Sequence, residues 1–353
     1  MCCKTINGEM VMLTNRALAA AVIASSLCLG LNATPASACS RILFNHGPHH
    51  VVARTMDLYI PDHAKIVVYP QGMERNGAVT VGQSHNWISK YGSVTVSSLG
   101  AGTSDGINEK GFVANLLYLH ETKYEARDNR PGVSNAMVLQ FLLDTSASVK
   151  EALESLNKTQ VVSEQVAGRT WPLHISISDA SGDSAVIEFV DGTMVVHHGS
   201  ESNVMTNEPP LAWQLNNMKR YKYFGGSESL PGDIDPASRF LRASAFLKTT
   251  PAPKDTRDAL AMAYGIAKTV SVPKGSENTS SMVGSEDTWP TLWTTLADST
   301  NLYYFFQAAE SPNMFWVDLS KINFAKGSPV LSVSGEDHSL NGEISAKLVQ
   351  EKR

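Results

Sequence analysis

The chain has 353 residues and a formal net charge of −5, with 29 lysines and arginines against 34 aspartates and glutamates. This length is ample for a large hydrophobic core in one big domain or two. The mildly acidic balance and the lack of any long charge run argue against nucleic acid as a partner. The sequence also has neither a glycine-rich phosphate loop nor a dinucleotide-binding fingerprint, and we expect no cofactor.

In chain order the predicted segments are strands in 40–128, helix in 134–156, a three-strand meander in 172–199, helices in 237–270 and strands in 290–319. The first two strands are expected to form a hairpin around a turn at Gly47-Pro48, and Ser134 can cap the first helical segment. Strand runs separated by helix runs favour an α+β fold of packed layers over a parallel doubly wound sheet.

The N-terminal segment has the three parts of an export signal. Basic residues precede an apolar core at 17–31, and the small residues 36–38 (Ala-Ser-Ala) fit a cleavage site. The apolar core is shorter than the roughly 20 residues of a membrane-spanning helix. We therefore predict that residues 1–38 are a removed signal peptide and that 39–353 form a single domain. The mature protein is expected to be periplasmic or secreted, with no stable membrane anchor.

Cysteine usage singles out Cys39. The chain has four cysteines, and the other three (Cys2, Cys3 and Cys28) lie within the predicted signal. The mature protein would thus begin with its one thiol, although disulfides are the common use of cysteine in exported proteins. A lipoprotein with an acylated Cys39 is an alternative, but the preceding residues match a Leu-rich lipoprotein box poorly.

A cysteine that begins a chain carries a thiol and an α-amino group on one residue. The thiolate is the nucleophile. An α-amino group with a pKa of about 7.7–8.0 can accept the thiol proton and later protonate a leaving amine. Such a residue exists only after processing, so the precursor would be inactive. The structural alternative is an inert Cys39 buried near the start of a strand.

The predicted hairpin brings a charged pair toward Cys39. An antiparallel return over the turn would place Arg54 and Asp57 beside the cysteine. Arg54 could lower the pKa of the thiol by favouring the thiolate, and Asp57 could hold and orient the amine. An exposed ion pair would explain the same spacing equally well.

Five short motifs, in this order, resemble the choloylglycine hydrolase family, which contains bile-salt hydrolases and penicillin V acylases. They are CSRILF from position 39, RTMD from 54, NEKGF from 108, VMTNEPP from 204 and LPGDIDPASRFLR from 230. The resemblance implies an N-terminal-nucleophile hydrolase with a four-layer αββα sandwich. It also implies hydrolysis of a non-peptide amide through a thioester acyl-enzyme.

The resemblance assigns catalytic roles to residues spread along the chain. Cys39 would be the nucleophile with its own amino group as base, and Arg54 and Asp57 would be the pair beside it. Arg239 would organise the charged cluster, and Arg242 takes that role if the motif register is wrong.

The oxyanion hole is expected from two neutral donors. The resemblance implies the backbone N–H of Tyr118 and the side-chain amide of Asn207. Pre-aimed donors of this kind stabilise the charge that develops on oxygen, and losing one typically costs about 10²–10³ in rate. Without the other motifs, Asn207 could simply cap the turn before two prolines, and Tyr118 could be strand packing.

The substrate is expected to be a small N-acyl amide. Tyr118 stands where many penicillin V acylases have Tyr and many bile-salt hydrolases have Asn, and the short TNEP–PGD separation resembles the Gram-negative branch. The leading hypothesis is a penicillin V acylase-like enzyme, with possible acyl-homoserine lactone acylase activity. The alternatives are a bile-salt hydrolase and a non-catalytic periplasmic lipoprotein or binding protein. Family members are often tetramers, so a homotetramer is possible.

An apolar pocket should bind the acid half of such a substrate. Four residues could line it or belong to the core: Tyr59, Trp87, Phe112 and Leu116. Leu58 stands where many relatives carry an aromatic residue, which leaves the pocket shape open. The histidine groups (His46, His49, His50, His197 and His198) are interpreted as polar hairpin residues rather than metal ligands.

Overall fold

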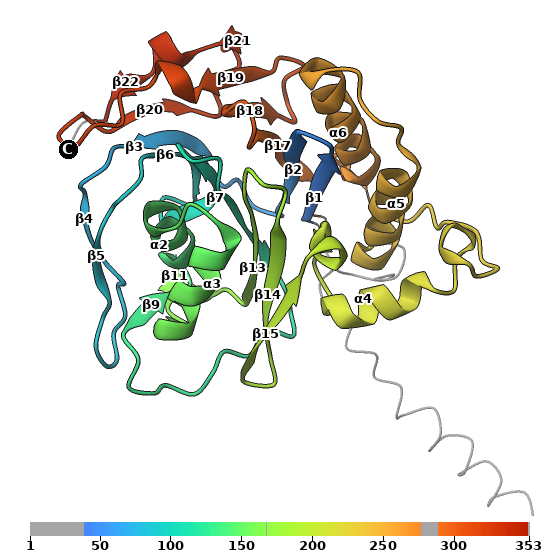
Figure 1. The fold of residues 1–353 in the computed structure, drawn as a ribbon, viewed down its shortest axis with the longest axis horizontal. Helices are drawn as coiled ribbons and strands as arrows, with labels where there is room; N and C mark the ends of the chain where they lie inside the picture. Colours follow the sequence, from blue (N-terminus) through green and yellow to red (C-terminus); the bar gives the residue numbers. More distant parts are fainter. Residues whose placement is uncertain (1–38, 167, 277–288, 352–353) are drawn as a thin grey trace, which may run out of the picture. The chain divides into compact units, whose positions relative to one another are not determined.

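The computed structural model describes residues 39–351, apart from residue 167 and residues 277–288 (Figure 1). All described residues belong to one compact unit. None of the described helices is long and apolar enough to cross a membrane.

The first large sheet contains seven strands and begins with the N-terminal hairpin. Its order is β16 (Val204–Thr206), β1 (Ser40–His46), β2 (His49–Asp57), β17 (Thr291–Asp298), β18 (Tyr303–Ala308), β19 (Phe315–Asp318) and β21 (Gly342–Glu343). Helix α5 (Pro236–Thr249) packs against β16 and β1, and α6 (Thr256–Val270) packs against β1, β2 and β17 (Figure 1).

The second large sheet contains nine strands and includes the predicted meander. Its order is β15 (Thr193–His198), β14 (Ser184–Val190), β13 (Leu173–Ser178), β8 (Val113–Tyr118), β7 (Gly102–Asn108), β6 (Ser93–Ser98), β3 (Lys65–Tyr69), β20 (Leu331–Ser334) and β22 (Val349–Gln350). Helix α2 (Val138–Thr145) packs on β7 and β8, and α3 (Val149–Lys158) packs beside α2.

Shorter elements lie outside these layers. They are the strand pairs β4 (Glu74–Asn76) with β5 (Asn86–Ile88), β9 (Gly132–Ser134) with β10 (Gln160–Val162), and β11 (Gln165–Val166) with β12 (Arg169–Thr170). The remaining helices are α4 (Leu211–Met218) and the 3-10 turns η1 (Ser200–Ser202), η2 (Lys222–Phe224), η4 (Leu319–Lys321) and η5 (Ser345–Lys347).

The two large sheets face each other between the two helical layers. Side chains cross the gap: Arg54 of β2 reaches the carbonyl of Leu116 in β8, and Thr295 of β17 reaches Asp105 of β7. One apolar cluster fills the space around the seven-stranded sheet, and a second lies between the nine-stranded sheet and α2. The expected α+β fold, a four-layer αββα sandwich, is confirmed.

Most predicted elements are present, and one helical prediction needs correction. The hairpin turns at Gly47-Pro48 with Ser40 opposite Thr55, and the meander and the two helices in 237–270 are present. Residues 134–156 do not form one helical segment capped by Ser134, because Ser134 belongs to β9 and pairs with Val162 of β10. The chain forms two helices instead, and Ser148 caps the second by accepting a hydrogen bond from the backbone of Glu151.

Gly111 makes a close contact between two turns. It has a φ of +78°, and an added Cβ would collide with the backbone oxygen of Ser299 in the turn between β17 and β18. Gly47 has a φ of +56° but has open space around it. We expect Gly47→Ala to cost about 1–2 kcal/mol from the left-handed backbone alone. Gly111→Ala should cost about 2–4 kcal/mol because a steric clash adds to that penalty. Urea unfolding of both variants checks this, and equal losses would contradict it.

Candidate active site

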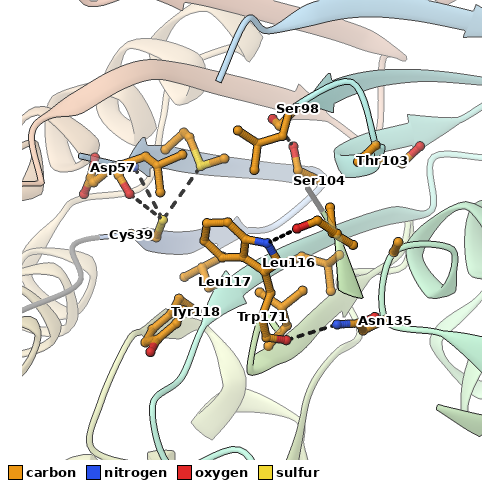
Figure 2. A pocket seen from close by; sticks show the side chains of 18 of the residues that line it. Cys39, Asp57, Ser98, Thr103, Ser104, Leu116, Leu117, Tyr118, Asn135 and Trp171 are labelled. Atoms are coloured by element: carbon orange, nitrogen blue, oxygen red, sulfur yellow. Dashed lines mark hydrogen bonds between the residues drawn. The ribbon is translucent and has the colours of Figure 1, made fainter. Parts of the chain in front are cut away.

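Cys39 lies directly before β1 and lines an apolar cavity. The hairpin register places it opposite Met56, between Arg54 and Asp57 along β2. Its side chain is buried, and its Sγ accepts a hydrogen bond from the backbone nitrogen of Asp57 at 3.4 Å (Figure 2). The same Sγ lies 4.0 Å from Met56 Sδ. The predicted proximity of Arg54 and Asp57 to the cysteine is therefore confirmed.

Burial governs the acidity of the thiol. It raises the pKa of Cys39, while the charge of Arg54 lowers that pKa and the charge of Asp57 raises it. Arg54 thus acts in the expected direction, but burial outweighs it. Met56 Sδ lies 3.2 Å from Arg54 Nη2 and 4.0 Å from Cys39 Sγ, so the thioether contacts both groups.

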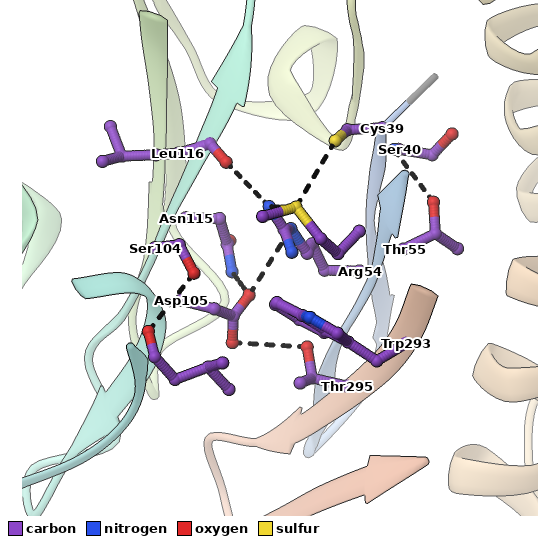
Figure 3. Close-up of polar contacts among 12 residues, drawn as sticks. Cys39, Ser40, Arg54, Thr55, Ser104, Asp105, Asn115, Leu116, Trp293 and Thr295 are labelled. Atoms are coloured by element: carbon purple, nitrogen blue, oxygen red, sulfur yellow. Dashed lines mark hydrogen bonds and ion pairs between the residues drawn. The ribbon is translucent and has the colours of Figure 1, made fainter. Parts of the chain in front are cut away.

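Arg54 is held between the two sheets. Its Nη2 donates to the carbonyl of Leu116 at 3.0 Å, its guanidinium lies 4.4 Å from the centre of the Trp293 ring, and its Nε is 3.9 Å from Asp105 Oδ2 (Figure 3). Asp105 in turn accepts hydrogen bonds from the side chains of Asn115, Thr295 and Tyr304. Sequence reasoning missed Asp105, since nothing in its local pattern marks it.

Asp57 is a buried acid with spare capacity to accept a proton or a cation. The Thr55 hydroxyl donates to its Oδ2 at 3.3 Å, and within the described residues its Oδ1 accepts no hydrogen bond. Burial raises the pKa of Asp57 to about 7, against the opposing charges of Arg239 and Arg54. A cation at the Cys39 nitrogen would lower this pKa by favouring the carboxylate.

Asn207 lies in the turn between β16 and α4 and contacts three of the predicted site residues. Its Oδ1 accepts from the Cys39 nitrogen at 2.5 Å and from Arg239 Nη2 at 3.1 Å, and its Nδ2 donates to the Tyr118 carbonyl at 2.8 Å. The guanidinium of Arg239 can only donate, so its contact with Oδ1 defines the orientation of the amide. One hydrogen of Nδ2 is engaged by Tyr118, which leaves the second available to a ligand.

The hydrogen bonds between β8 and β13 leave the backbone of Tyr118 facing Asn207. Tyr118 pairs with Leu173 of β13, and the next residue, Leu119, donates its N–H to Pro172. Because antiparallel residues alternate between bonding to one neighbour and to the other, the Tyr118 N–H points away from β13. On that side the pairing of β8 with β7 covers only Val113 to Asn115.

Of the two candidate arginines, Arg239 is the one in contact with Cys39. Its Nη1 donates to the Cys39 carbonyl at 2.7 Å and to Ser40 Oγ at 2.6 Å, and its Nε donates to Ile234 O. Arg242 instead bonds the carbonyls of Thr269, Pro231 and Asp233.

The cavity beside Cys39 has a volume of about 100 Å³ and walls that are mainly apolar. Figure 2 shows side chains of Leu116, Leu117, Tyr118 and Trp171 around it. Its other apolar and aromatic lining residues include Met56, Leu58, Leu99, Leu173 and Trp289.

Only one of the four predicted pocket residues lines this cavity. Leu116 does, whereas Trp87 and Phe112 belong to the core cluster under α2. Tyr59 is not part of the cavity lining and packs on Trp289, with ring centres 5.0 Å apart. Large apolar residues in strands suit a core and a pocket equally, so their sequence pattern could not separate the two.

The histidines make contacts with neighbouring polar groups. His50 Nδ1 lies 2.7 Å from Asn45 Oδ1, and His198 lies 2.9 Å from Asp183. His197 lies 3.5 Å from the buried Glu188. In the described part of the chain, no group of three or more His, Cys, Asp or Glu residues is arranged to hold a metal ion.

Comparison with known proteins agrees with this geometry. Residues 39–332 match the family described as linear amide C–N hydrolases, choloylglycine hydrolase family. A penicillin V acylase of Pectobacterium atrosepticum is 39% identical over 88% of this chain and 89% of its own length. A bile salt hydrolase/transferase of Clostridium perfringens is 28% identical over 78% of this chain and 90% of its own length.

The two arginines of α5 provide a matched pair for testing the site. Arg239→Lys should reduce kcat/KM for amide hydrolysis by about 100-fold or more, because lysine lacks the planar fork that holds two oxygens at once. Arg242→Lys should stay within about threefold, because the carbonyls that this side chain bonds belong to Pro231, Asp233 and Thr269 rather than to Cys39. Steady-state kinetics of both variants, with unfolding curves as a folding check, measures the difference. Similar losses in the two variants would contradict the assignment.

A solved structure supports the same relationship. The penicillin V acylase from Agrobacterium tumefaciens superimposes with a TM-score of 0.79 at 35% sequence identity, covering 89% of this chain and 98% of that one. The family match extends over well more than half of the chain and includes Cys39 and the contact residues Asn207 and Arg239. The chain therefore belongs to the choloylglycine hydrolase family of linear amide C–N hydrolases.

Proposed function

We propose that this amide hydrolase uses Cys39, freed by export processing, as both nucleophile and base, and that it acts on substrates of the penicillin V type. The observation that carries the proposal is the convergence on Cys39 of a buried acid, a buried arginine and a side-chain amide beside an apolar cavity. The family match also begins at Cys39.

The first half of the reaction forms a thioester. The free α-amine of Cys39 takes the thiol proton, and the thiolate attacks the amide carbonyl carbon to form a C–S bond. Negative charge moves to the carbonyl oxygen, where the second hydrogen of Asn207 Nδ2 and the Tyr118 N–H donate to it. The C–N bond then breaks, and the α-ammonium returns its proton to the leaving amine.

The second half releases the acid. The α-amine, now neutral, takes a proton from a water molecule, whose oxygen attacks the thioester carbonyl. The C–S bond breaks, and the proton returns to the sulfur. Asp57 and Asn207 serve the amine in both halves: Asn207 Oδ1 lies 2.5 Å from the Cys39 nitrogen, and the open Oδ1 of Asp57 provides a counter-charge for the ammonium.

The cavity favours a compact acid half. An aromatic phenoxyacetyl group suits a small cavity lined by Leu, Met and Trp side chains, because such a site desolvates one apolar ring closely. The relative at 39% identity is a penicillin V acylase. Acyl-homoserine lactones offer a similarly apolar acyl chain and are a second substrate class. Bile salts are the alternative, supported by the relative at 28% identity.

Exported protein should begin at Cys39, and Cys39→Ser should abolish turnover while the fold survives. Intact mass and N-terminal sequencing of protein recovered from the periplasm test the first point, and progress curves with penicillin V test the second. A chain that begins elsewhere or a fully active serine variant would refute the nucleophile. A diacylglycerol adduct on Cys39 would instead support the lipoprotein.

Substrate choice can be tested with a panel of amides. We expect kcat/KM for penicillin V to exceed that for glycine- and taurine-conjugated bile salts by about tenfold or more, because small differences in apolar fit each change affinity by about 1–3 kcal/mol. Acyl-homoserine lactones of several chain lengths complete the panel. A preference for bile salts would overturn the penicillin V proposal and leave the amide hydrolase chemistry standing.

A further inference from the structure

Glu188 is a buried acid for which the proposed reaction has no role. It lies on β14 with 1% of its surface exposed, and its neighbours are His174 of β13 at 3.3 Å and His197 of β15 at 3.5 Å. Burial raises the pKa of Glu188, but the hydrogen bond with His174, the nearby His197 and the N–H of Leu211 together lower it to about 2. The side chain is therefore a carboxylate at neutral pH.

The carboxylate caps the helix that follows Asn207. The backbone N–H of Leu211, the first residue of α4, donates to Glu188 Oε1 at 3.0 Å and lies 3.2 Å from Oε2. The N-cap position of α4 is Pro210, whose side chain makes no capping hydrogen bond. Glu188 thus supplies from another element the acceptor and the negative charge that a helix N-terminus favours.

This cap holds the turn that carries Asn207. Only three residues separate Asn207 from Leu211, and Gln214 of α4 donates to the carbonyls of Glu208 and Pro209 within that turn. The position of the N-terminus of α4 therefore determines where the Asn207 amide lies.

The same acid is linked to the strand of Tyr118. Glu188 lies on β14, which pairs with β13, and β13 pairs with β8 through Leu173 and Tyr118. His174, the partner of Glu188, lies next to Leu173 in β13. One carboxylate thus connects the sheet that carries Tyr118 to the turn that carries Asn207.

We propose that Glu188 is a positioning residue of the oxyanion hole. It holds the Asn207 amide where that amide and the Tyr118 N–H can donate to the same oxygen. This inference rests on the proposed function, because it takes both groups as donors to the developing oxyanion. Glu188 touches no substrate and acts only through the turn. A small displacement of an oxyanion donor weakens stabilisation of the transition state more than it weakens binding of the substrate.

The test compares Glu188→Gln, which removes the charge but keeps the size, with Asn207→Ala and with the double variant. Kinetics with penicillin V are normalised to active sites titrated by thiol alkylation. Glu188→Gln should lower kcat about tenfold with KM within about twofold. In the Asn207→Ala background it should change kcat less than about twofold, because the donor that it positions is already absent.

A second pair of variants isolates the hydrogen bond. Leu211→Pro removes the N–H that Glu188 binds, at a helix position that accepts proline, whereas Leu211→Ala trims the side chain and keeps the N–H. Leu211→Pro should show a kcat about tenfold below that of Leu211→Ala, with similar KM. This comparison decides the question even if Glu188→Gln folds poorly.

Asp144→Asn is the matched control for loss of a buried charge, because Asp144 bonds Arg75 and Trp87 far from the turn. It should lower stability and leave kcat unchanged. Multiplicative effects of Glu188→Gln and Asn207→Ala, or equal kcat in the two Leu211 variants, would overturn the inference. Failure of the unsubstituted enzyme to hydrolyse any N-acyl amide would overturn the proposed function instead.

Discussion

The site depends on the buried guanidinium of Arg239. It donates to the Cys39 carbonyl and to Ser40 Oγ, at the start of β1, and to Asn207 Oδ1, in the turn before α4. A lysine has no planar fork to join these oxygens. Because Arg239 is fully buried, its charge needs compensation, and the nearby carboxylate of Asp57 favours the charged form. One side chain thus joins Cys39 and Asn207 and lies near Asp57.

Charge balance in a dry interior explains the rest of the arrangement. Arg54 and Arg239 are buried with Asp57 and Asp105, so the site holds two cations and two acids that burial makes reluctant to ionise. In this setting burial raises the pKa of the thiol more than Arg54 lowers it. In the proposed mechanism the amine on the same residue opposes this effect, because it accepts the thiol proton.

The sequence predicted part of the site from local geometry. A two-residue turn at Gly47-Pro48 sets the hairpin register, so the proximity of Cys39 to Arg54 and Asp57 follows from counting along two strands. Tyr118, Asn207 and Arg239 came from family resemblance, because no spacing rule brings together residues so distant in the chain. Asp105 and Glu188 were missed for the same reason: each is recognisable only by partners from other strands and helices.

By itself the sequence determined the layered α+β fold, the hairpin and the candidate nucleophile, because these follow from periodicity, turn chemistry and composition over short distances. Tertiary structure decided which arginine contacts Cys39, which aromatic residues line the cavity and how the Asn207 amide is oriented. Those choices depend on how helices pack on sheets and on which donors face which acceptors. Both arise only when elements far apart in the chain meet.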